Sequence, residues 1–239
     1  MSGVYEEALR LRSRDVDMFR RLRSSELFRL LQEASIRHTE QLGMGRDKTL
    51  DRGILWVLMM QRIEIARMPE YDEDIVLKSW PGQTMHLLFP RYYSVGDASG
   101  AELIRASALW CLVDAAARKT VFPEKYGVTI DGVVTGNEIA MPSALPARPC
   151  VREGEFTVPY SYVDLNGHMN NARYIDVAED FVGAAAAGKK LRAIRTEYQS
   201  EARLGETLRL RLGESGEGCF SLSGETDRRV CRMELEYGE

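Results

Sequence analysis

The residues best suited to chemistry lie in one short stretch of the chain, the nine residues Val-Asp-Leu-Asn-Gly-His-Met-Asn-Asn from Val163 to Asn171. An acid, an amide and an imidazole occupy alternate positions in it, at Asp164, Asn166 and His168. Since side chains alternate along an extended segment, this spacing predicts that the three share one side. Such a set can move a proton and hold a polarised carbonyl, which are the needs of acyl-group hydrolysis.

The same stretch carries the signals of a helix start. Gly167 gives the backbone freedom where an extended segment becomes a helix, and Asn170 or Asn171 can cap that helix. The helix N-terminus offers unpaired N–H groups and the positive end of the helix dipole. We therefore expect a seat there for a thioester carbonyl that gains negative charge during attack.

Two other interpretations of this motif need to be weighed. Taken alone, the residues fit equally well a polar turn whose side chains only satisfy backbone groups. A metal site is disfavoured, because one histidine with an acid and an amide supplies few of the ligands that zinc needs. No metal or other cofactor is predicted.

The first half of the chain predicts a helix followed by long strands. Leucine and alanine recur at helical spacing from Ser24 to Leu42, with Ser24 or Ser25 as N-cap and Gly43 just past the end. Extended runs follow, separated by turn residues. The expected strands are Ile54–Arg67, Ile75–Trp80, His86–Val95 and Ala101–Val113.

The second half repeats this plan after a proline-containing connector. An extended entry, Gly154–Tyr162, precedes a helix from about Asn170 to Ala187, which is followed by strands at Leu191–Ala202, Thr207–Gly213, Cys219–Thr226 and Arg229–Tyr237. A one-sided helix followed by strands long enough to wrap it is typical of the hot-dog fold, and the repeat indicates an internal duplication. We predict an α+β protein of two tandem hot-dog modules, residues 1–130 and 153–239, joined by a linker at 131–152. Two unrelated α+β modules are the alternative.

Composition excludes several classes of protein. The 239 residues are 44% hydrophobic and 28% charged, as in globular proteins, and the net charge of −4 argues against a broad nucleic-acid footprint. The N-terminal stretch lacks the apolar core of a secretory signal, and the longest apolar run, Ile54–Met60, is too short to span a membrane. Four cysteines without a CxxC pair favour a reducing compartment, so we expect a cytoplasmic protein.

Beyond these patterns, the sequence resembles the acyl-acyl carrier protein thioesterases of plants and bacteria, which are tandem hot-dog proteins. The matching stretches lie in both halves, and the resemblance runs from about Asp15 to the C-terminus. They are Leu31–Ala34, Ile54–Leu58, Ile104–Trp110, Asp164–Ile175 and Thr196–Ala202.

The resemblance implies a catalytic set of four residues, Asp164, Asn166, His168 and Glu201. It also implies release of free fatty acid from an acyl carrier protein, which ends chain elongation. Plant members often carry a cysteine after the equivalent of Glu201, where this chain has Ala202, so a cysteine nucleophile is not available there.

Aligning the halves by their helix starts suggests that the first module has lost this set. The alignment places Met18, Arg20 and Leu22 opposite the three motif residues. A separate pairing of Ala66–Met68 with Ala202–Leu204 places Ile65 opposite Glu201. We therefore expect catalysis in the second module and the acyl-chain pocket in the first.

The sequence leaves the attacking group, the thioester substrate and the assembly of the protein open. The attacking group is either water activated by Glu201 or Asp164 itself through an anhydride. The rival functions are acyl-coenzyme A hydrolysis and non-catalytic acyl binding. Carrier docking is expected at a basic run, Arg20–Arg23 or Lys189–Arg192, and a homodimer is optional rather than required. His38, expected to be partly exposed on the first helix, and His86, expected to open a strand, are predicted to be non-catalytic.

Overall fold

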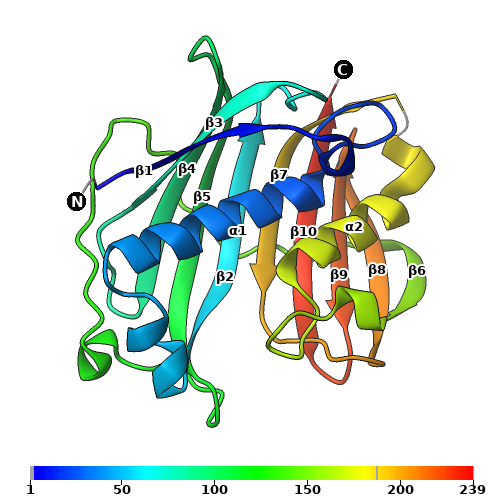
Figure 1. Ribbon diagram of the computed structural model, residues 1–239. Helices are drawn as coiled ribbons and strands as arrows, with labels where there is room; N and C mark the ends of the chain where they lie inside the picture. Colours follow the sequence, from blue (N-terminus) through cyan, green and yellow to red (C-terminus); the bar gives the residue numbers. More distant parts are fainter. Residues whose placement is uncertain (1–2, 187, 239) are drawn as a thin grey trace. The chain divides into compact units, whose positions relative to one another are not determined.

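The computed structural model describes residues 3–186 and 188–238 of the chain, which form two compact units. Unit 1 comprises Met1–Arg23 and Arg29–Pro142, and unit 2 comprises Ser24–Phe28 and Ser143–Glu239. Each unit has a helix and a five-stranded antiparallel sheet (Figure 1).

Unit 1 contains a sheet in the order β1-β3-β4-β5-β2, with helix α1 on one face. Four 3-10 turns complete it, η1 (Ser13–Asp15), η2 (Arg46–Lys48), η3 (Leu50–Arg52) and η4 (Pro123–Tyr126). The main elements are β1 (Tyr5–Arg10), α1 (Ser24–Gln41, of which Arg29–Gln41 belongs to this unit), β2 (Ile54–Ile65), β3 (Asp74–Pro81), β4 (Leu88–Asp97) and β5 (Glu102–Asp114).

Unit 2 contains a sheet in the order β7-β10-β9-β8-β6 and helix α2. Its bounds are β6 (Cys150–Thr157), η5 (Tyr160–Tyr162), α2 (Asn171–Val182), η6 (Gly183–Ala186), β7 (Lys190–Tyr198), β8 (Thr207–Gly216), β9 (Cys219–Glu225) and β10 (Arg229–Gly238). Both units therefore have the hot-dog plan that the strand and helix patterns predict.

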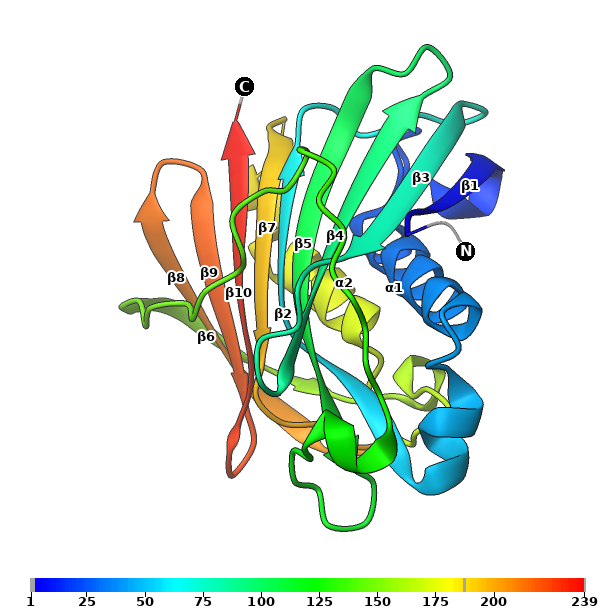
Figure 2. The same cartoon turned by 90° about the vertical axis from the view of Figure 1, so that its left-hand side faces the viewer.

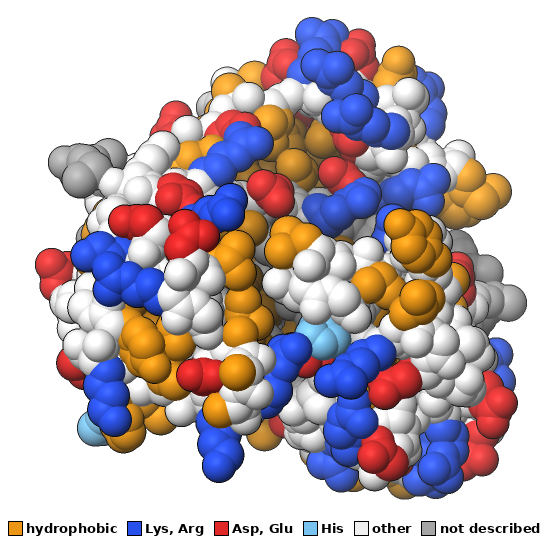
Figure 3. Space-filling model, turned by 60° about the horizontal axis from the view of Figure 1, so that its bottom comes forward, with side chains coloured by type: hydrophobic (Ala, Val, Ile, Leu, Met, Phe, Trp, Pro, Cys, Tyr) orange, Lys and Arg blue, Asp and Glu red, His pale blue; other side chains and the backbone are white. Residues whose placement is uncertain are grey.

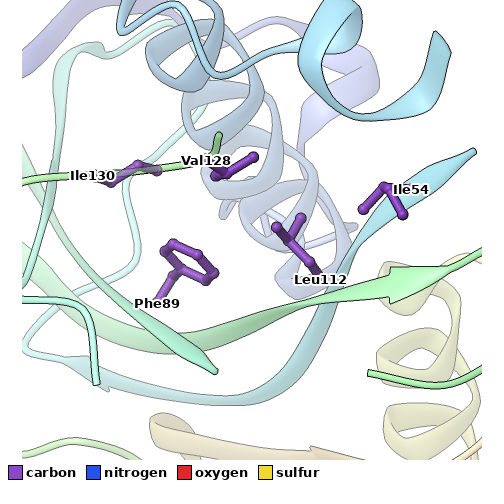
Figure 4. Close-up of a cluster of buried hydrophobic side chains, with 5 residues drawn as sticks. All are labelled: Ile54, Phe89, Leu112, Val128 and Ile130. Atoms are coloured by element: carbon purple, nitrogen blue, oxygen red, sulfur yellow. The ribbon is translucent and has the colours of Figure 1, made fainter. Parts of the chain in front are cut away.

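The core of unit 1 includes an apolar cluster at one end of the sheet. Ile54, Phe89 and Leu112 come from three neighbouring strands, and Val128 and Ile130 from the segment after η4 (Figure 4). All five side chains are buried, so the segment after η4 closes this end of the core with apolar surface removed from water.

The two units repeat the same backbone hydrogen bonds at the junctions that frame their helices. This repetition aligns the units residue by residue without reference to sequence identity. The matching bonds are Leu11 N to Glu73 O with Val158 N to Glu206 O, Leu22 N to Pro69 O with Met169 N to Ala202 O, Arg23 N to Asp15 O with Asn170 N to Tyr162 O, and Arg67 N to Leu103 O with Ser200 N to Val230 O.

The predicted helices and strands are present, with differences at their ends. Ser24 and Ser25 lie inside α1 and its N-cap is Arg23, so the predicted cap is wrong by one or two residues. Asn170 caps α2 as predicted, with Oδ1 accepting from Ala172 N at 3.0 Å. Ala187, the predicted end of this helix, lies outside the described residues.

The predicted strand ends run too far where turns intervene. The strand expected to reach Ala202 ends at Tyr198, because Gln199 N and Ser200 N both donate to Val230 O and turn the chain. His86, expected to open a strand, lies in a turn before β4 with φ of 51°. Strand β1 was not predicted, since its charged residues conceal the alternation of exposed with less exposed positions.

A buried polar cluster lies between α1 and the sheet of unit 1. The Arg91 guanidinium donates to Ser79 Oγ at 3.0 Å and Thr39 Oγ1 at 3.1 Å, and is hydrogen-bonded to His38 Nδ1 at 3.1 Å. His38 is fully buried, so its predicted partial exposure is wrong; the contact with Arg91 explains why an imidazole lies inside. Burial lowers the pKa of Arg91, because desolvation disfavours its charge.

Unit 2 has apolar side chains where unit 1 has this cluster. Ser79 lies opposite Tyr93 on β3 and β4, and the matching pair on β8 and β9 is Leu212 opposite Leu222. Phe220 matches Arg91, and all three of these unit 2 side chains are buried. The fold itself therefore does not require a polar cluster at this place.

The connector before β6 is held by side chains of both sheets. In unit 1 it crosses the face of the sheet away from α1 (Figure 2), where Ser107 Oγ donates to Ala140 O at 2.8 Å. In unit 2, buried Glu197 accepts from Leu145 N at 3.0 Å, and Arg232 donates to Leu145 O. Glu197 and Arg232 are cross-strand neighbours that together bind both polar groups of one peptide residue.

Among the described residues, no helix is long and apolar enough to cross a membrane.

Candidate active site

The candidate motif forms a tight turn rather than an extended segment. Val163 and Met169 bridge across it, Asp164 N donates to His168 O at 2.9 Å, and Gly167 N donates to Asp164 O at 3.0 Å. Gly167 has φ of 78°, a left-handed conformation that suits glycine. The prediction that alternation places three side chains on one side is therefore wrong, because the chain reverses within the motif.

Asp164 stabilises this turn through its side chain. Its Oδ1 accepts from Asn166 N at 2.9 Å, the arrangement of an Asx turn. In the matching turn of unit 1, Asp17 Oδ1 accepts from Phe19 N at 2.8 Å and Arg21 N at 2.9 Å. The same aspartate role thus occurs in both units, so for this residue the polar-turn interpretation describes what is seen.

His168 and Glu201 lie in direct contact. His168 Nε2 is 3.0 Å from Glu201 Oε2; the histidine side chain is 9% exposed and the glutamate side chain 38%. Two backbone contacts bring the turn and the loop between β7 and β8 together: His168 bridges to Arg203, and Met169 N donates to Ala202 O at 2.8 Å. The fold places a nearly buried imidazole against a carboxylate that still reaches solvent.

Two further side chains fix the loop that carries Glu201. Tyr174 of α2 accepts from Ala202 N at 3.3 Å, and Arg228, from the turn between β9 and β10, donates to Glu201 O at 2.8 Å. Burial raises the pKa of Tyr174, which keeps its hydroxyl protonated. Sequence reasoning did not assign either residue to the site, since both act only through contacts made in the folded unit.

The start of α2 leaves hydrogen-bond donors near the motif. Ala172 N donates to Asn170 Oδ1, and Arg173 N donates to Asn170 O at 2.9 Å. The N–H of Asn171 has no acceptor among the described residues, and neither does the exposed side-chain amide of Asn166. These two groups can donate to an oxygen that gains negative charge.

The matching positions of unit 1 lack three of the four polar residues. The shared hydrogen bonds place Asp17, Phe19 and Arg21 opposite Asp164, Asn166 and His168. They place Met68 opposite Glu201. The predicted pairings are wrong. Those of Met18, Arg20 and Leu22 fail because the helix cap is Arg23, and that of Ile65 fails because the strand ends before the loop.

The cysteines and metal-binding side chains do not add to the site. Burial raises the pKa of Cys111 to about 11 and of Cys231 to about 12, so both stay protonated near neutral pH. Ala202 occupies the position that follows Glu201. No cluster of three or more metal-binding side chains occurs among the residues that the structure describes.

Family comparisons cover both halves of the chain. Residues 2–131 match the acyl-ACP thioesterase N-terminal domain, and residues 150–237 match the acyl-ACP thioesterase C-terminal domain. An acyl-[acyl-carrier-protein] hydrolase from Cuphea viscosissima is 24% identical over 186 residues, 72% of this chain and 45% of that protein. A dodecanoyl-[acyl-carrier-protein] hydrolase from Cinnamomum camphora is 23% identical, over 86% of this chain and 58% of that protein. The chain thus spans about half the length of the curated relatives it matches.

Solved structures share the fold over the whole chain. An acyl-ACP thioesterase from Bacteroides thetaiotaomicron matches with a TM-score of 0.87 at 23% identity, covering 100% of both chains. A 12:0-ACP thioesterase from Umbellularia californica matches with a TM-score of 0.82 at 19% identity, covering 100% of this chain and 98% of that one.

Proposed function

Because the chain belongs to the acyl-ACP thioesterase family, we propose that it hydrolyses the thioester of fatty acyl-acyl carrier protein and releases free fatty acid. The observation that carries this proposal is the 3.0 Å contact between His168 Nε2 and Glu201 Oε2 beside the start of α2. A polar pair of this kind suits acid–base chemistry on a bound water.

The proposed reaction uses Glu201 as the base. Its carboxylate takes a proton from water as the water oxygen bonds to the thioester carbonyl carbon. The oxygen of the tetrahedral intermediate accepts hydrogen bonds from the Asn166 amide and the Asn171 N–H. When the C–S bond breaks, the departing thiolate takes a proton delivered through His168, which leaves a fatty acid and a free thiol.

Asp164 acts in this proposal by holding the turn, not as a nucleophile. The support is its bond to Asn166 N and the equivalent bond of Asp17 in a turn that lacks the histidine. Direct attack by Asp164 would create an acyl anhydride, which hydroxylamine converts to a stable hydroxamate. Turnover in hydroxylamine followed by mass spectrometry should leave Asp164 unmodified, and a hydroxamate at this residue would refute the water mechanism.

The substrate proposal is tested by comparing two thioesters of one acyl chain. We expect kcat/KM for acyl-acyl carrier protein to exceed that for acyl-coenzyme A. A reversed preference would make the chain an acyl-coenzyme A thioesterase. Binding of both without hydrolysis would make it a non-catalytic acyl-binding protein.

The units are proposed to divide the work, with residues 1–130 holding the acyl chain and residues 153–239 carrying the chemistry. The support is the retention of Asn166, His168 and Glu201 in unit 2, where unit 1 has Phe19, Arg21 and Met68. Exchanging β2 with that of a relative of different selectivity should change the preferred chain length. An unchanged profile would refute this division.

Location and assembly are also proposals. A cytoplasmic location is supported by the unpaired cysteines, and cell fractionation tests it. The chain is proposed to work as a monomer or a homodimer, which light scattering of the purified protein distinguishes.

A further inference from the structure

The surface around the His168–Glu201 pair combines exposed apolar side chains with a free cation. Leu165, at the tip of the turn, is 87% exposed, and Leu204, in the loop after Glu201, is 55% exposed. Arg203 lies between Glu201 and Leu204 in sequence, and its backbone forms an isolated antiparallel β-bridge with His168. The space-filling view shows a face of the molecule on which Lys and Arg side chains lie beside hydrophobic ones (Figure 3).

The guanidinium of Arg203 has no ion-pair or hydrogen-bond partner among the described residues. Its backbone N–H donates to Glu206 Oε2 at 2.8 Å, but that carboxylate lies 3.6 Å from Arg228, which neutralises it. Arg203 therefore presents an uncompensated positive charge next to the candidate dyad.

The internal duplication supplies a control for this feature. The matching loop of unit 1 has Glu70 where unit 2 has Arg203. The backbone of Glu70 forms a β-bridge with Arg21, as the backbone of Arg203 does with His168. The loop can thus be built with either sign of charge at this position. A positive charge occurs in the unit that carries the dyad, so the fold alone does not explain it.

We propose that Arg203, Leu165 and Leu204 form a docking rim for the acidic surface of the protein that carries the acyl thioester. This inference rests on the proposed function, because a carrier that delivers its thioester to Glu201 must contact the side chains around it. An acidic protein surface complements Arg203, and the two leucines give it apolar area to cover. The net charge of −4 makes a local cation necessary for this attraction.

The rim replaces the basic runs expected from the sequence as the main docking candidate. Arg21 is paired with Asp17 at 3.2 Å and Leu22 is buried, so the first run offers less free charge than its sequence suggests. In the second run, Lys189 lies 3.7 Å from Glu217.

The test compares three substrates of one acyl chain: acyl-acyl carrier protein, acyl-coenzyme A and the acyl thioester of N-acetylcysteamine, which has neither protein nor phosphate. Arg203→Glu should lower the ratio of kcat/KM for the carrier substrate to that for the small thioester by about three- to tenfold, less at high salt. Arg203→Gln should lower it by a smaller factor. Arg211→Glu, an equal charge change on β8 of the same unit, is the matched control and should keep the ratio.

Each outcome decides the proposal. A larger loss on the carrier substrate than on acyl-coenzyme A supports docking to protein. An equal loss on both means that Arg203 contacts a phosphate of the arm and overturns protein docking. An unchanged ratio in Arg203→Glu also overturns it. Failure of the unmodified enzyme to hydrolyse any of the three substrates would instead refute the proposed function.

Discussion

Glu201 and Met68 occupy the same position in two copies of one loop. In each copy the carbonyl of the next residue accepts a hydrogen bond from the backbone N–H of the residue before the helix cap. Met169 N donates to Ala202 O in one copy, and Leu22 N donates to Pro69 O in the other, both at 2.8 Å. The backbone is therefore the same, and only the side chains decide which copy carries a carboxylate against an imidazole.

Removing either member of the His168–Glu201 pair should lower turnover without unfolding the protein. We expect Glu201→Gln and His168→Ala each to reduce kcat by at least about a hundredfold, the scale of a lost acid–base group. Steady-state assays with acyl-acyl carrier protein measure this. Glu155→Gln, which removes an exposed carboxylate on β6, is the control and should keep kcat. Near-normal turnover in both site variants would disprove the assignment.

The four cysteines should divide into two reactive and two unreactive thiols. Desolvation raises the pKa of Cys111 to about 11 and of Cys231 to about 12, so both stay protonated at pH 8 and gain thiolate only as the pH approaches those values. Iodoacetamide at pH 8 should label the partly exposed Cys150 and Cys219 first, as peptide mass spectrometry can show.

Activity should survive the combined replacement of all four cysteines by serine, since Ala202 follows Glu201 and no cysteine contributes to the motif. Loss of turnover in the folded quadruple variant would contradict the proposed mechanism. So would a loss of activity in the unmodified protein that is stoichiometric with the alkylation of a single thiol.

The connector contact in unit 2 offers a stability test with an internal control. Glu197→Ala leaves the buried Leu145 N–H without its acceptor, so we expect a loss of about 1–3 kcal/mol in the free energy of unfolding. Glu64 is the matching residue of unit 1, where it pairs with Arg105 at 3.2 Å near the surface. Glu64→Ala should cost less than about 1 kcal/mol. Urea unfolding of the two variants measures the difference, and equal costs would refute the argument.

The buried polar cluster of unit 1 should depend on Arg91. Arg91→Met removes the donor to Ser79 Oγ and Thr39 Oγ1, so two buried hydroxyls lose a partner. We expect a loss of about 2–4 kcal/mol in the free energy of unfolding. Adding the apolar residues of unit 2, as Ser79→Leu and Tyr93→Leu, should recover part of it. An unchanged midpoint in Arg91→Met alone would show that the cluster contributes no net stability.

Sequence patterns predicted the elements better than they predicted the contacts. Periodicity and turn residues located both helices and nine strands, because burial on one face imposes a period that the sequence must carry. Strand β1 was missed, since charged residues occupy both its exposed positions Glu6 and Arg10 and its half-buried position Glu7, and its partner β3 is distant in sequence.

The sequence predicted that Glu201 lies near the motif, which the structure confirms, but it mispredicted the local geometry of the motif. The catalytic roles of the four residues stay predictions. The motif does bring His168 to Glu201, but it does so by turning at Gly167 rather than by strand alternation. Tyr174, Arg203 and Arg228 could not be predicted, because their importance depends on which loops meet in three dimensions. The burial of His38 depends likewise on Arg91, which lies far away in sequence.

The paired turns have a consequence for how such a protein can change over generations. Backbone hydrogen bonds and one aspartate maintain each turn, so the other side chains can be exchanged without loss of the frame. A duplicated scaffold of this kind includes one unit whose turn can accept new side chains while the other unit retains its residues and its function. Phe19, Arg21 and Met68 are the positions at which a protein engineer would try to install a second reaction centre.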